Sequence, residues 1–508
     1  MGYMNKKIAA FFISFAILVN LGTMITYGKP DWPSDTGIMA EAGIVIDADS
    51  GAVLFGQQIH VPFPPASITK LLTALVVAEH CAMDEIVTFS HDAVYNVESG
   101  SGNKLALDEG DQISVEDCLH LLLLLSSNQS ANALAEHVAG SREAFVEMMN
   151  QRIAEIGCAE SHFANPSGLN DDNQYVSAYD MALIAAEAFR NDTVLRISST
   201  KRYRVGSTIN NPEGANISME HRILMAENSS SEYYCEGAMA GKTGYTSIAG
   251  NTLVTYAHRD GRNLISVILR GSQPQYYIDG KTILNFGFAS FKNESIKNLE
   301  TFMQEQEELE IQGTTYPMSR LRLEDGVITL PTAAEFSDAE RALATELPAN
   351  HPGGAVAMLE YIYNERRIGT AYIYDTELEA ELAAQASREA EEASGDMETG
   401  EDHGGEGTPE VSDPEESAGD QEGSSSRQGG GFSLAAGQAA VVAAALAGTA
   451  AVGGAAFLVV RRKRQERIQR EIRRERRRQR LLEIGYNEEE FEELMRRRRE
   501  NGQNEKNE

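Results

Sequence analysis

The chain has 508 residues, which is enough for two or three folded domains. Its 44 basic and 76 acidic residues give a formal net charge of -32, which argues against nucleic acid as a partner of the whole chain. The charge is unevenly distributed, because residues 461–508 hold 17 basic and 12 acidic residues, a net of +5, and the rest therefore carries -37. These two parts are predicted to face different surroundings.

The N-terminus has the layout of a secretory signal peptide, predicted over residues 1–28. Lys6 and Lys7 precede an uncharged apolar run over 8–25, and polar sequence follows. An uncleaved membrane anchor is the alternative. Export would permit disulfides, but the four cysteines show no CxxC pairing and allow three connectivities, so they stay unassigned: Cys81, Cys118, Cys158 and Cys235.

Residues 37–292 alternate apolar helical stretches with strand-like runs such as 42–46 and 264–269, which predicts a mixed α and β domain, class α+β. Residues 293–375 turn to strand patterns. The clearest strands are 355–363 and 368–374, joined at 364–367 by a predicted hairpin. A second, smaller β-rich domain is therefore expected.

Beyond these domains the sequence predicts a tethered C-terminus. Residues 376–431 are rich in Glu, Asp, Ser and Gly, so we expect a disordered acidic linker that spaces the domains from the bilayer. Residues 432–460 carry no charge and are long enough for a transmembrane helix; a buried core helix is the alternative. The basic residues that follow predict a cytoplasmic tail over 461–508, with everything before 432 outside the cell.

Part of that tail, 461–480, has 12 basic and 3 acidic residues, which is enough to bind anionic lipid. A simple stop-transfer role is the alternative, and partner docking through residues 486–499 stays open. The sequence therefore predicts a single-pass protein of the cell membrane.

Ser67 and Lys70 form the first of three short motifs that could carry chemistry. They are predicted to lie on one face at the first turn of a helix, because the apolar run 71–77 follows. A neutral lysine beside a serine hydroxyl can act as the base that a serine nucleophile needs, and a helix N-terminus offers free N–H groups to an oxyanion. The alternative is a serine N-cap with an exposed lysine.

The second motif, Ser126-Ser127-Asn128, interrupts two apolar helical stretches at 119–125 and 131–138. Polar side chains among so many apolar ones need hydrogen-bond partners, and lining a catalytic cleft would supply them. An ordinary turn between helices is the alternative.

The third motif, Lys242-Thr243-Gly244, begins a predicted strand over 242–246, with another predicted over 251–256. Glycine at a strand edge lets a substrate backbone approach closely, and a positive charge there suits a free carboxylate. A plain hairpin with a surface lysine is the alternative.

Together and in this order, the three motifs resemble those of the penicillin-recognising serine enzymes. The surrounding sequence is similar to that of the D-alanyl-D-alanine carboxypeptidases, the low-molecular-mass penicillin-binding proteins. That similarity is carried by residues 43–51, 65–70, 165–169, 178–180 and 241–246. The resemblance implies an antiparallel sheet with a helical cluster over residues 37–292. It also implies an enzyme that removes the terminal D-alanine from peptidoglycan stem peptides and binds β-lactams covalently.

The resemblance also implies roles in acyl transfer. Ser67 would attack the carbonyl between the two D-alanines, and Lys70 would accept the serine proton. Ser126 would relay a proton to the leaving D-alanine, and Asn128 would orient Lys70 and the substrate amide. No metal or organic cofactor is implied.

The same resemblance places substrate-binding groups on the third motif. Lys242 and Thr243 would hold the terminal carboxylate, with Gly244 beside them. The backbone N–H groups of Ser67 and Tyr245 would form the oxyanion hole.

Several residues depart from the family pattern. Ser167 stands where histidine is frequent, Gln129 and Ser130 replace Asp-Ala, and His221 replaces an asparagine and is expected to reshape the cleft rim. None of these changes removes a motif residue.

Two other functions remain as alternatives. A β-lactamase would share the fold, but no ExxLN-like element lies between residues 128 and 242. The intact motifs argue against a non-catalytic wall-binding protein.

Overall fold

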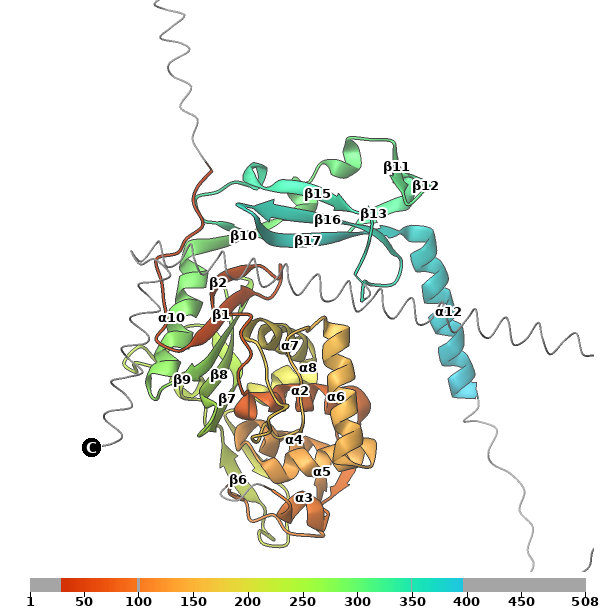
Figure 1. Cartoon of the computed structure of the whole chain (residues 1–508). Helices are drawn as coiled ribbons and strands as arrows, with labels where there is room; N and C mark the ends of the chain where they lie inside the picture. Colours follow the sequence, from red (N-terminus) through yellow and green to blue (C-terminus); the bar gives the residue numbers. More distant parts are fainter. Residues whose placement is uncertain (1–28, 98–100, 349, 396–508) are drawn as a thin grey trace, which may run out of the picture. The chain divides into compact units, whose positions relative to one another are not determined.

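The computed structural model describes residues 29–97, 101–348 and 350–395 (Figure 1). The predicted signal peptide (1–28), transmembrane helix (432–460) and basic tail (461–508) lie outside the described residues, as does most of the predicted linker. Among the described helices, none is long and apolar enough to cross a bilayer.

A five-stranded sheet forms the centre of the N-terminal part, with strand order β2-β1-β9-β8-β7 and antiparallel neighbours throughout. The strands are β1 (Ala42–Asp47), β2 (Val53–Gln57), β7 (Ala238–Thr246), β8 (Gly250–Arg259) and β9 (Arg262–Gly271). The predicted strands at 42–46 and 264–269 are confirmed. The third motif lies inside β7, which begins at Ala238 rather than at Lys242.

The sheet is buried on both faces, because successive side chains of a strand point in opposite directions. Ile44 and Ile46 belong to the apolar cluster shared with α2 and α7, whereas Val45 belongs to the cluster on the α10 side. Helix α10 (Gln275–Ser290) covers one face, and α7 (Ala178–Arg190) packs against the other. This arrangement explains why β1 is buried along its whole length.

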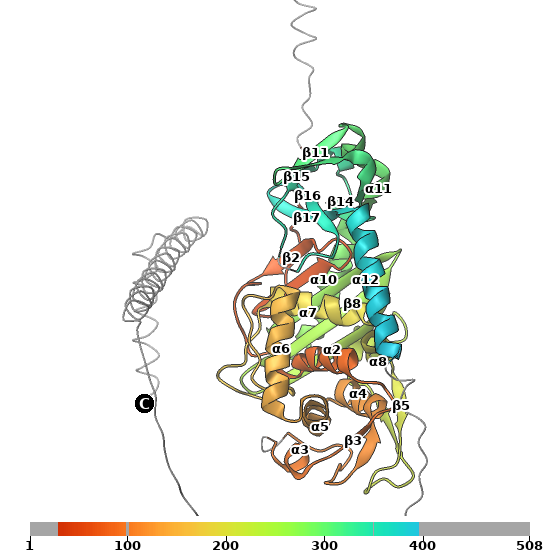
Figure 2. The same cartoon turned by 90° about the vertical axis from the view of Figure 1, so that its right-hand side faces the viewer.

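The helical cluster lies on the α7 side of the sheet (Figure 2). Several helices begin at serines whose side chains accept a backbone N–H, as Ser114 does for α4 and Ser127 for α5. The other helices of this part are α2 (Lys70–His80), α3 (His91–Tyr95), α4 (Val115–Leu124), α5 (Asn128–Ala139), α6 (Arg142–Ile156), α8 (Asp192–Ser198) and α9 (Arg222–Met225). Two short ribbons complete it, β3 (Ile86–Thr88) with β4 (Gln112–Ser114) and β5 (Arg202–Val205) with β6 (Ala215–Ser218).

Strands dominate the chain from residue 291 to 375, as predicted. They are β10 (Phe291–Ser295), β11 (Glu308–Ile311), β12 (Thr314–Pro317), β13 (Leu321–Leu323), β14 (Val327–Pro331), β15 (Glu340–Ala344), β16 (Ala355–Tyr363) and β17 (Arg366–Asp375). Helix α11 (Ile296–Leu299) follows β10. Apolar side chains of these strands, among them Ile328 and Tyr361, form their own buried cluster. The domain boundary at residue 292 stays a prediction.

The hairpin between β16 and β17 has a tighter turn than predicted. Only Asn364 and Glu365 lie outside the strands, with φ of 46° and 62°. Two consecutive residues with positive φ are typical of the two-residue turn that matches the twist of a β-hairpin.

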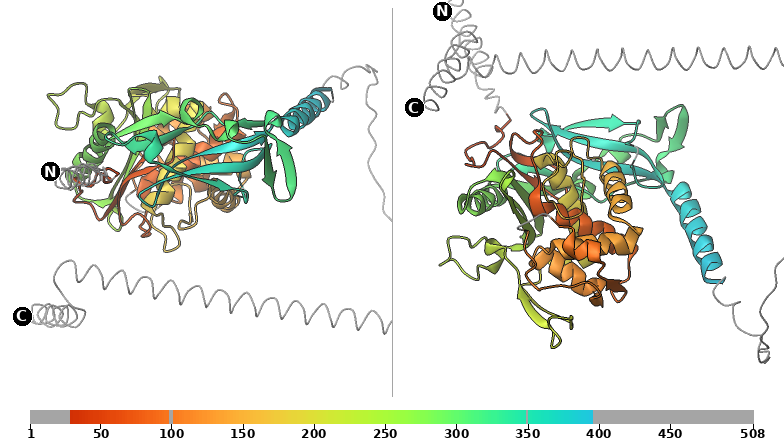
Figure 3. Two further views of the ribbon diagram at one scale, coloured as in Figure 1. Left: turned by 90° about the horizontal axis from the view of Figure 1, so that it is seen from above. Right: turned by 60° about the horizontal axis from the view of Figure 1, so that its bottom comes forward.

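The prediction of disorder is wrong for the beginning of the acidic segment, because Thr376–Gly395 forms helix α12 (Figure 3). The segment is poor in large apolar residues but rich in Ala and Glu, which favour helix. Glu377 and Glu379 lie in the first turn, where acidic side chains suit the helix dipole. Glu379 also pairs with Arg322 at 2.6 Å.

Residues 29–33 tie the two parts together. Trp32, the single tryptophan of the chain, has its ring centroid 4.8 Å from that of Phe291 and 6.2 Å from that of Tyr363. Its indole N–H donates to the carbonyl of Leu54 at 3.3 Å, and the Tyr363 hydroxyl donates to the carbonyl of Pro30 at 2.5 Å. The N-terminal segment therefore contacts both the five-stranded sheet and the later strands.

Candidate active site

Ser67 lies in a 3-10 turn, Ala66–Thr69, that leads directly into α2. The residue at the N-cap of this turn is Pro65, and Ser67 makes no capping bond. Gly168 packs against this turn. It has φ +85°, and a Cβ on it would lie 1.9 Å from the carbonyl oxygen of Ala66. The helix-cap alternative is thus wrong, and Gly168 packs directly against the Ala66–Thr69 turn.

Lys70 is fully buried, and its Nζ is surrounded by oxygen acceptors. It donates to Ser67 Oγ at 3.1 Å, to Asn128 Oδ1 at 2.7 Å and to the carbonyl of Ser167. No carboxylate is among these partners. Burial, together with the charge of Lys242, holds the pKa of Lys70 well below its usual range. This lowering of the pKa favours the neutral form of the amine, which lies within hydrogen-bond distance of the Ser67 hydroxyl.

Ser126 and Lys242 connect the second motif to the third by a side-chain hydrogen bond. Lys242 is 2% exposed, and its Nζ donates to Ser126 Oγ at 3.1 Å and to the carbonyl of Thr243 at 2.8 Å. Burial lowers the pKa of Lys242 to about 7. Ser126 itself has φ 61°, a conformation that costs a non-glycine residue of order 1 kcal/mol. The surface-lysine alternative is wrong, and the link between helices is a strained turn that aims a hydroxyl at Lys242.

Strand β7 passes very close to the Ser67 turn at Gly244. A Cβ on Gly244 would lie 2.8 Å from the backbone nitrogen of Ser67 and 2.3 Å from Thr252 Oγ1, so only glycine fits. Thr252 Oγ1 in turn donates to the carbonyl of Pro65 at 2.9 Å. Thr243 is half-buried, and the side chain of Tyr245 is 66% exposed. The three motifs, which span 178 positions from Ser67 to Gly244, thus form one cluster.

A family model described as D-alanyl-D-alanine carboxypeptidase matches residues 29–273. The D-alanyl-D-alanine carboxypeptidase DacA of Haemophilus influenzae is 33% identical over 305 residues, which cover 58% of this chain and 72% of that protein. The D-alanyl-D-alanine carboxypeptidase DacF of Bacillus subtilis is 28% identical over 293 residues, 56% of this chain and 72% of that protein. The chain belongs to the D-alanyl-D-alanine carboxypeptidase family.

Solved structures agree with this family membership. Penicillin binding protein 5 from Haemophilus influenzae superposes with a TM-score of 0.54 and 26% identity, covering 67% of this chain and 98% of that one. Penicillin binding protein 6B from Escherichia coli gives a TM-score of 0.51 at 24% identity, covering 68% and 98%, and supports the fold alone. The predicted α+β fold of the catalytic part is confirmed.

In this D-alanyl-D-alanine carboxypeptidase family member, Lys104 and Glu220 also lie at the site, although neither belongs to one of the three motifs. Lys104 Nζ pairs with Glu220 at 2.7 Å and donates to the carbonyl of Leu125, the residue before Ser126, at 3.1 Å. The charge of Lys104 lowers the pKa of both Lys70 and Lys242, whereas Glu220 raises the pKa of Lys242. The two residues are 116 positions apart in the sequence, so only the fold brings them together and no short motif could contain both.

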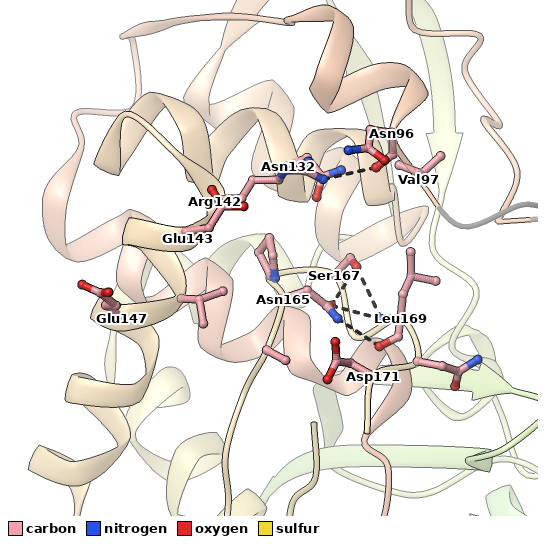
Figure 4. Close-up of a pocket in the computed structure, with 14 residues that line it drawn as sticks. Asn96, Val97, Asn132, Arg142, Glu143, Glu147, Asn165, Ser167, Leu169 and Asp171 are labelled. Carbon is pink, nitrogen blue, oxygen red and sulfur yellow. Dashed lines mark hydrogen bonds between the residues drawn. The ribbon is translucent and has the colours of Figure 1, made fainter. Parts of the chain in front are cut away.

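A polar cavity of about 610 Å³ adjoins the cluster at Ser167 (Figure 4). Ser67, Ser126 and Lys242 do not line it; the link is Ser167, whose carbonyl holds Lys70. Asn165 Oδ1 fixes this loop by accepting from Ser167 Oγ at 3.0 Å and from the Gly168 N–H at 2.8 Å. The opposite wall includes three charged side chains of α6, Arg142, Glu143 and Glu147. The cavity is therefore suited to polar ligands.

The expectation that His221 shapes the cleft rim is wrong. His221 is 3% exposed and lies behind β7, where a Cβ on Gly241 would come within 2.9 Å of its Nε2. Burial lowers the pKa of His221 to about 4, so it is neutral. The other departures are also buried: Gln129 donates to the Gly102 carbonyl at 3.2 Å, and Ser130 donates to Ser127 Oγ at 3.0 Å. All four cysteines are free thiols.

Proposed function

We propose that this protein is a serine-type carboxypeptidase that removes the terminal D-alanine from peptidoglycan stem peptides through an acyl-enzyme on Ser67. The observation that carries the proposal is the burial of Lys70 between Ser67 Oγ and Asn128 Oδ1, at 3.1 and 2.7 Å, with its pKa held low. A serine hydroxyl needs such a neighbouring base to become a nucleophile. Family membership supplies the substrate class.

In the acylation step, Ser67 Oγ attacks the carbonyl carbon between the two D-alanines while Lys70 Nζ takes the hydroxyl proton. The negative charge that develops on the carbonyl oxygen would be held by the backbone N–H groups of Ser67 and Tyr245. The close approach of Gly244, the residue before Tyr245, to the Ser67 nitrogen supports this assignment. When the peptide bond breaks, Ser126 passes a proton to the nitrogen of the leaving D-alanine. The hydrogen bond that Ser126 Oγ accepts from Lys242 Nζ supports this relay role.

The terminal carboxylate of the substrate would bind Lys242 and Thr243. A buried ammonium attracts a carboxylate more strongly than an exposed one does, because water does not screen the pair. Water then hydrolyses the ester between Ser67 and the shortened peptide, which restores the free hydroxyl.

A β-lactam would acylate Ser67 by the same attack, and its open ring would stay attached as a slowly hydrolysed ester. A β-lactamase requires a carboxylate that activates the hydrolytic water. Within the described part of the chain, no carboxylate bonds to Ser67 or Lys70. This favours the carboxypeptidase over the β-lactamase.

The place of action is proposed from composition. The apolar runs at 8–25 and 432–460 support export of the catalytic part and attachment to the membrane by a single span. The basic residues over 461–480 support a cytoplasmic tail that contacts anionic lipid.

The test is to incubate the full-length protein with labelled penicillin and, separately, with a peptide ending in D-Ala-D-Ala. We expect a stable penicilloyl adduct and release of D-alanine, both absent in Ser67→Ala. Ser199→Ala, which removes a hydroxyl that bonds the carbonyl of Leu195 in α8, is the matched control and should behave as the unmodified protein. Release of D-alanine by Ser67→Ala would overturn the proposal, and penicillin binding without peptide hydrolysis would point to a β-lactam-binding protein of another function.

A further inference from the structure

We infer that Cys81, Glu85 and His137 form a binding site for a divalent transition-metal ion, with Zn²⁺ as the ion that the donor set fits best. The site lies at the end of α2 opposite to Ser67 and Lys70, and none of its residues belongs to the machinery described above. It stands independently of the proposed function.

The three side chains already converge. The Cys81 sulfur, one Glu85 carboxylate oxygen and one His137 ring nitrogen all lie within 4.8 Å of one another. Glu85 Oε2 and His137 Nε2 are 2.9 Å apart. Bond lengths of 2.0–2.3 Å to tetrahedral zinc place neighbouring donor atoms about 3.3–3.6 Å apart. Small side-chain rotations therefore bring these donors to a tetrahedral arrangement with a water in the fourth position.

The backbone under each donor is fixed by hydrogen bonds. Cys81 is the C-cap of α2, and its N–H donates to the carbonyl of Val77. Glu85 closes the following turn, because its N–H donates to the Ala82 carbonyl at 3.3 Å and its carbonyl accepts the Val115 N–H at 2.9 Å. His137 lies in the last turn of α5. The donors thus come from three anchored elements, which limits the chain entropy lost on binding an ion.

The site is accessible without being fully exposed. Cys81 is half-buried, the His137 side chain is 23% exposed and the Glu85 side chain is 42% exposed. An ion can enter from solvent and retain a water ligand. The combination of thiolate, imidazole and carboxylate selects zinc over Mg²⁺ or Ca²⁺, which bind oxygen donors almost exclusively.

The position of the site suggests what the ion does. Both α2 and α5 end at it, and a cation at the C-terminal end of a helix is favoured by the helix dipole. Lys70 opens α2 and Asn128 opens α5, and their side chains are 2.7 Å apart. An ion that joins the two C-terminal ends therefore stabilises the pair of helices that positions the buried lysine.

The test uses the full-length protein, stripped with a chelator and titrated with Zn²⁺ and with Co²⁺. We expect one equivalent of either ion to bind and a thiolate-to-cobalt charge-transfer absorption to appear. Binding releases the Cys81 thiol proton, so the thiolate band is a direct report of that ligand. Zn²⁺ should also raise the melting temperature, because it binds only the folded state, whereas Mg²⁺ should leave it unchanged.

Variants distinguish this site from chance binding. Cys81→Ser should abolish the cobalt band, and His137→Gln should weaken Zn²⁺ binding at least about tenfold. Cys158→Ser is the matched control, since Cys158 is also a half-buried free thiol but lies outside the cluster, and should keep the band. Far-UV circular dichroism shows that each variant is folded. A band that persists in Cys81→Ser, or no bound ion in the folded protein, overturns the inference and leaves an ordinary Glu85–His137 ion pair.

Discussion

Lys70 and Lys242 are both buried, and burial makes each a weaker base than a lysine in water. Their proposed tasks require opposite charge states. Lys70 has to be neutral to accept the proton of Ser67, whereas Lys242 has to be charged to hold a carboxylate. Burial lowers the pKa of both lysines, and at Lys70 the charge of Lys242 adds to this effect.

These pKa directions predict a bell-shaped pH dependence of kcat/KM. The rate should rise with pH while Lys70 loses its proton, and fall as Lys242 loses its proton around its pKa of about 7. A bound carboxylate raises the pKa of Lys242, so the alkaline limb of kcat should lie at higher pH than that of kcat/KM. Steady-state kinetics on a D-Ala-D-Ala peptide measure both limbs. Coincident alkaline limbs would contradict the role of Lys242 as the carboxylate partner.

Lys104 and Glu220 allow a paired test of the same electrostatics. Lys104→Gln removes a positive charge that lowers the pKa of Lys242, so the alkaline limb of kcat/KM should move to higher pH by roughly 0.5–1 unit. Glu220→Gln removes a charge that raises that pKa, so the limb should move to lower pH. Shifts in the same direction in both variants would show that the ion pair acts only through the shape of the cleft.

At the scale of elements, the aromatic contacts of Trp32 with Phe291 and Tyr363 hold the N-terminal segment against the rest of the protein. Trp32→Ala should lower the free energy of unfolding by about 2 kcal/mol, less than for a fully buried tryptophan, because its ring is half-buried. Trp32→Phe, which keeps a ring against Phe291, is the control and should recover most of this loss. Denaturant unfolding followed by circular dichroism measures the change. An unaltered midpoint in Trp32→Ala would contradict the role of this contact.

The acidic segment shows how local propensity can override composition. Helix α12 forms where a disordered linker is predicted, since Ala, Glu and Leu favour helix and the ion pair of Glu379 with Arg322 attaches its first turn to β13. Composition measures how much apolar surface a segment can bury, not whether its backbone can form internal hydrogen bonds.

For the whole molecule, the sequence predicts that one segment attaches the protein to the membrane and another lets the catalytic part reach wall peptides at a distance from the bilayer. Deleting residues 432–508 should release the penicillin-labelled protein from the membrane fraction, because the uncharged run is removed. Deleting only 396–431, which leaves α12 intact, should keep the protein in the membrane fraction but lower wall trimming in cells. Labelled-penicillin gels of membrane and soluble fractions report the first effect, and analysis of wall peptides reports the second. Finding the protein in the soluble fraction after deletion of 396–431 would contradict the assignment of membrane attachment to 432–508.

The sequence by itself indicates the chemistry. Residue type and local spacing single out five candidate site residues, and the apolar flanks indicate which elements carry them: Ser67, Lys70, Ser126, Asn128 and Lys242. Their roles stay predictions. The main strands of the sheet and of the β16–β17 hairpin were predicted for the same reason, since period-two apolar patterns are local. Element ends were less accurate, as the earlier start of β7 shows.

Only the tertiary structure decided which residues meet. The carbonyl of Ser167 on Lys70, the Lys104–Glu220 pair and the burial of His221 arise from contacts between distant positions. No local pattern encodes them. The low pKa of each lysine likewise depends on exclusion of water by surrounding elements, because desolvation is a property of the assembled core and not of a motif.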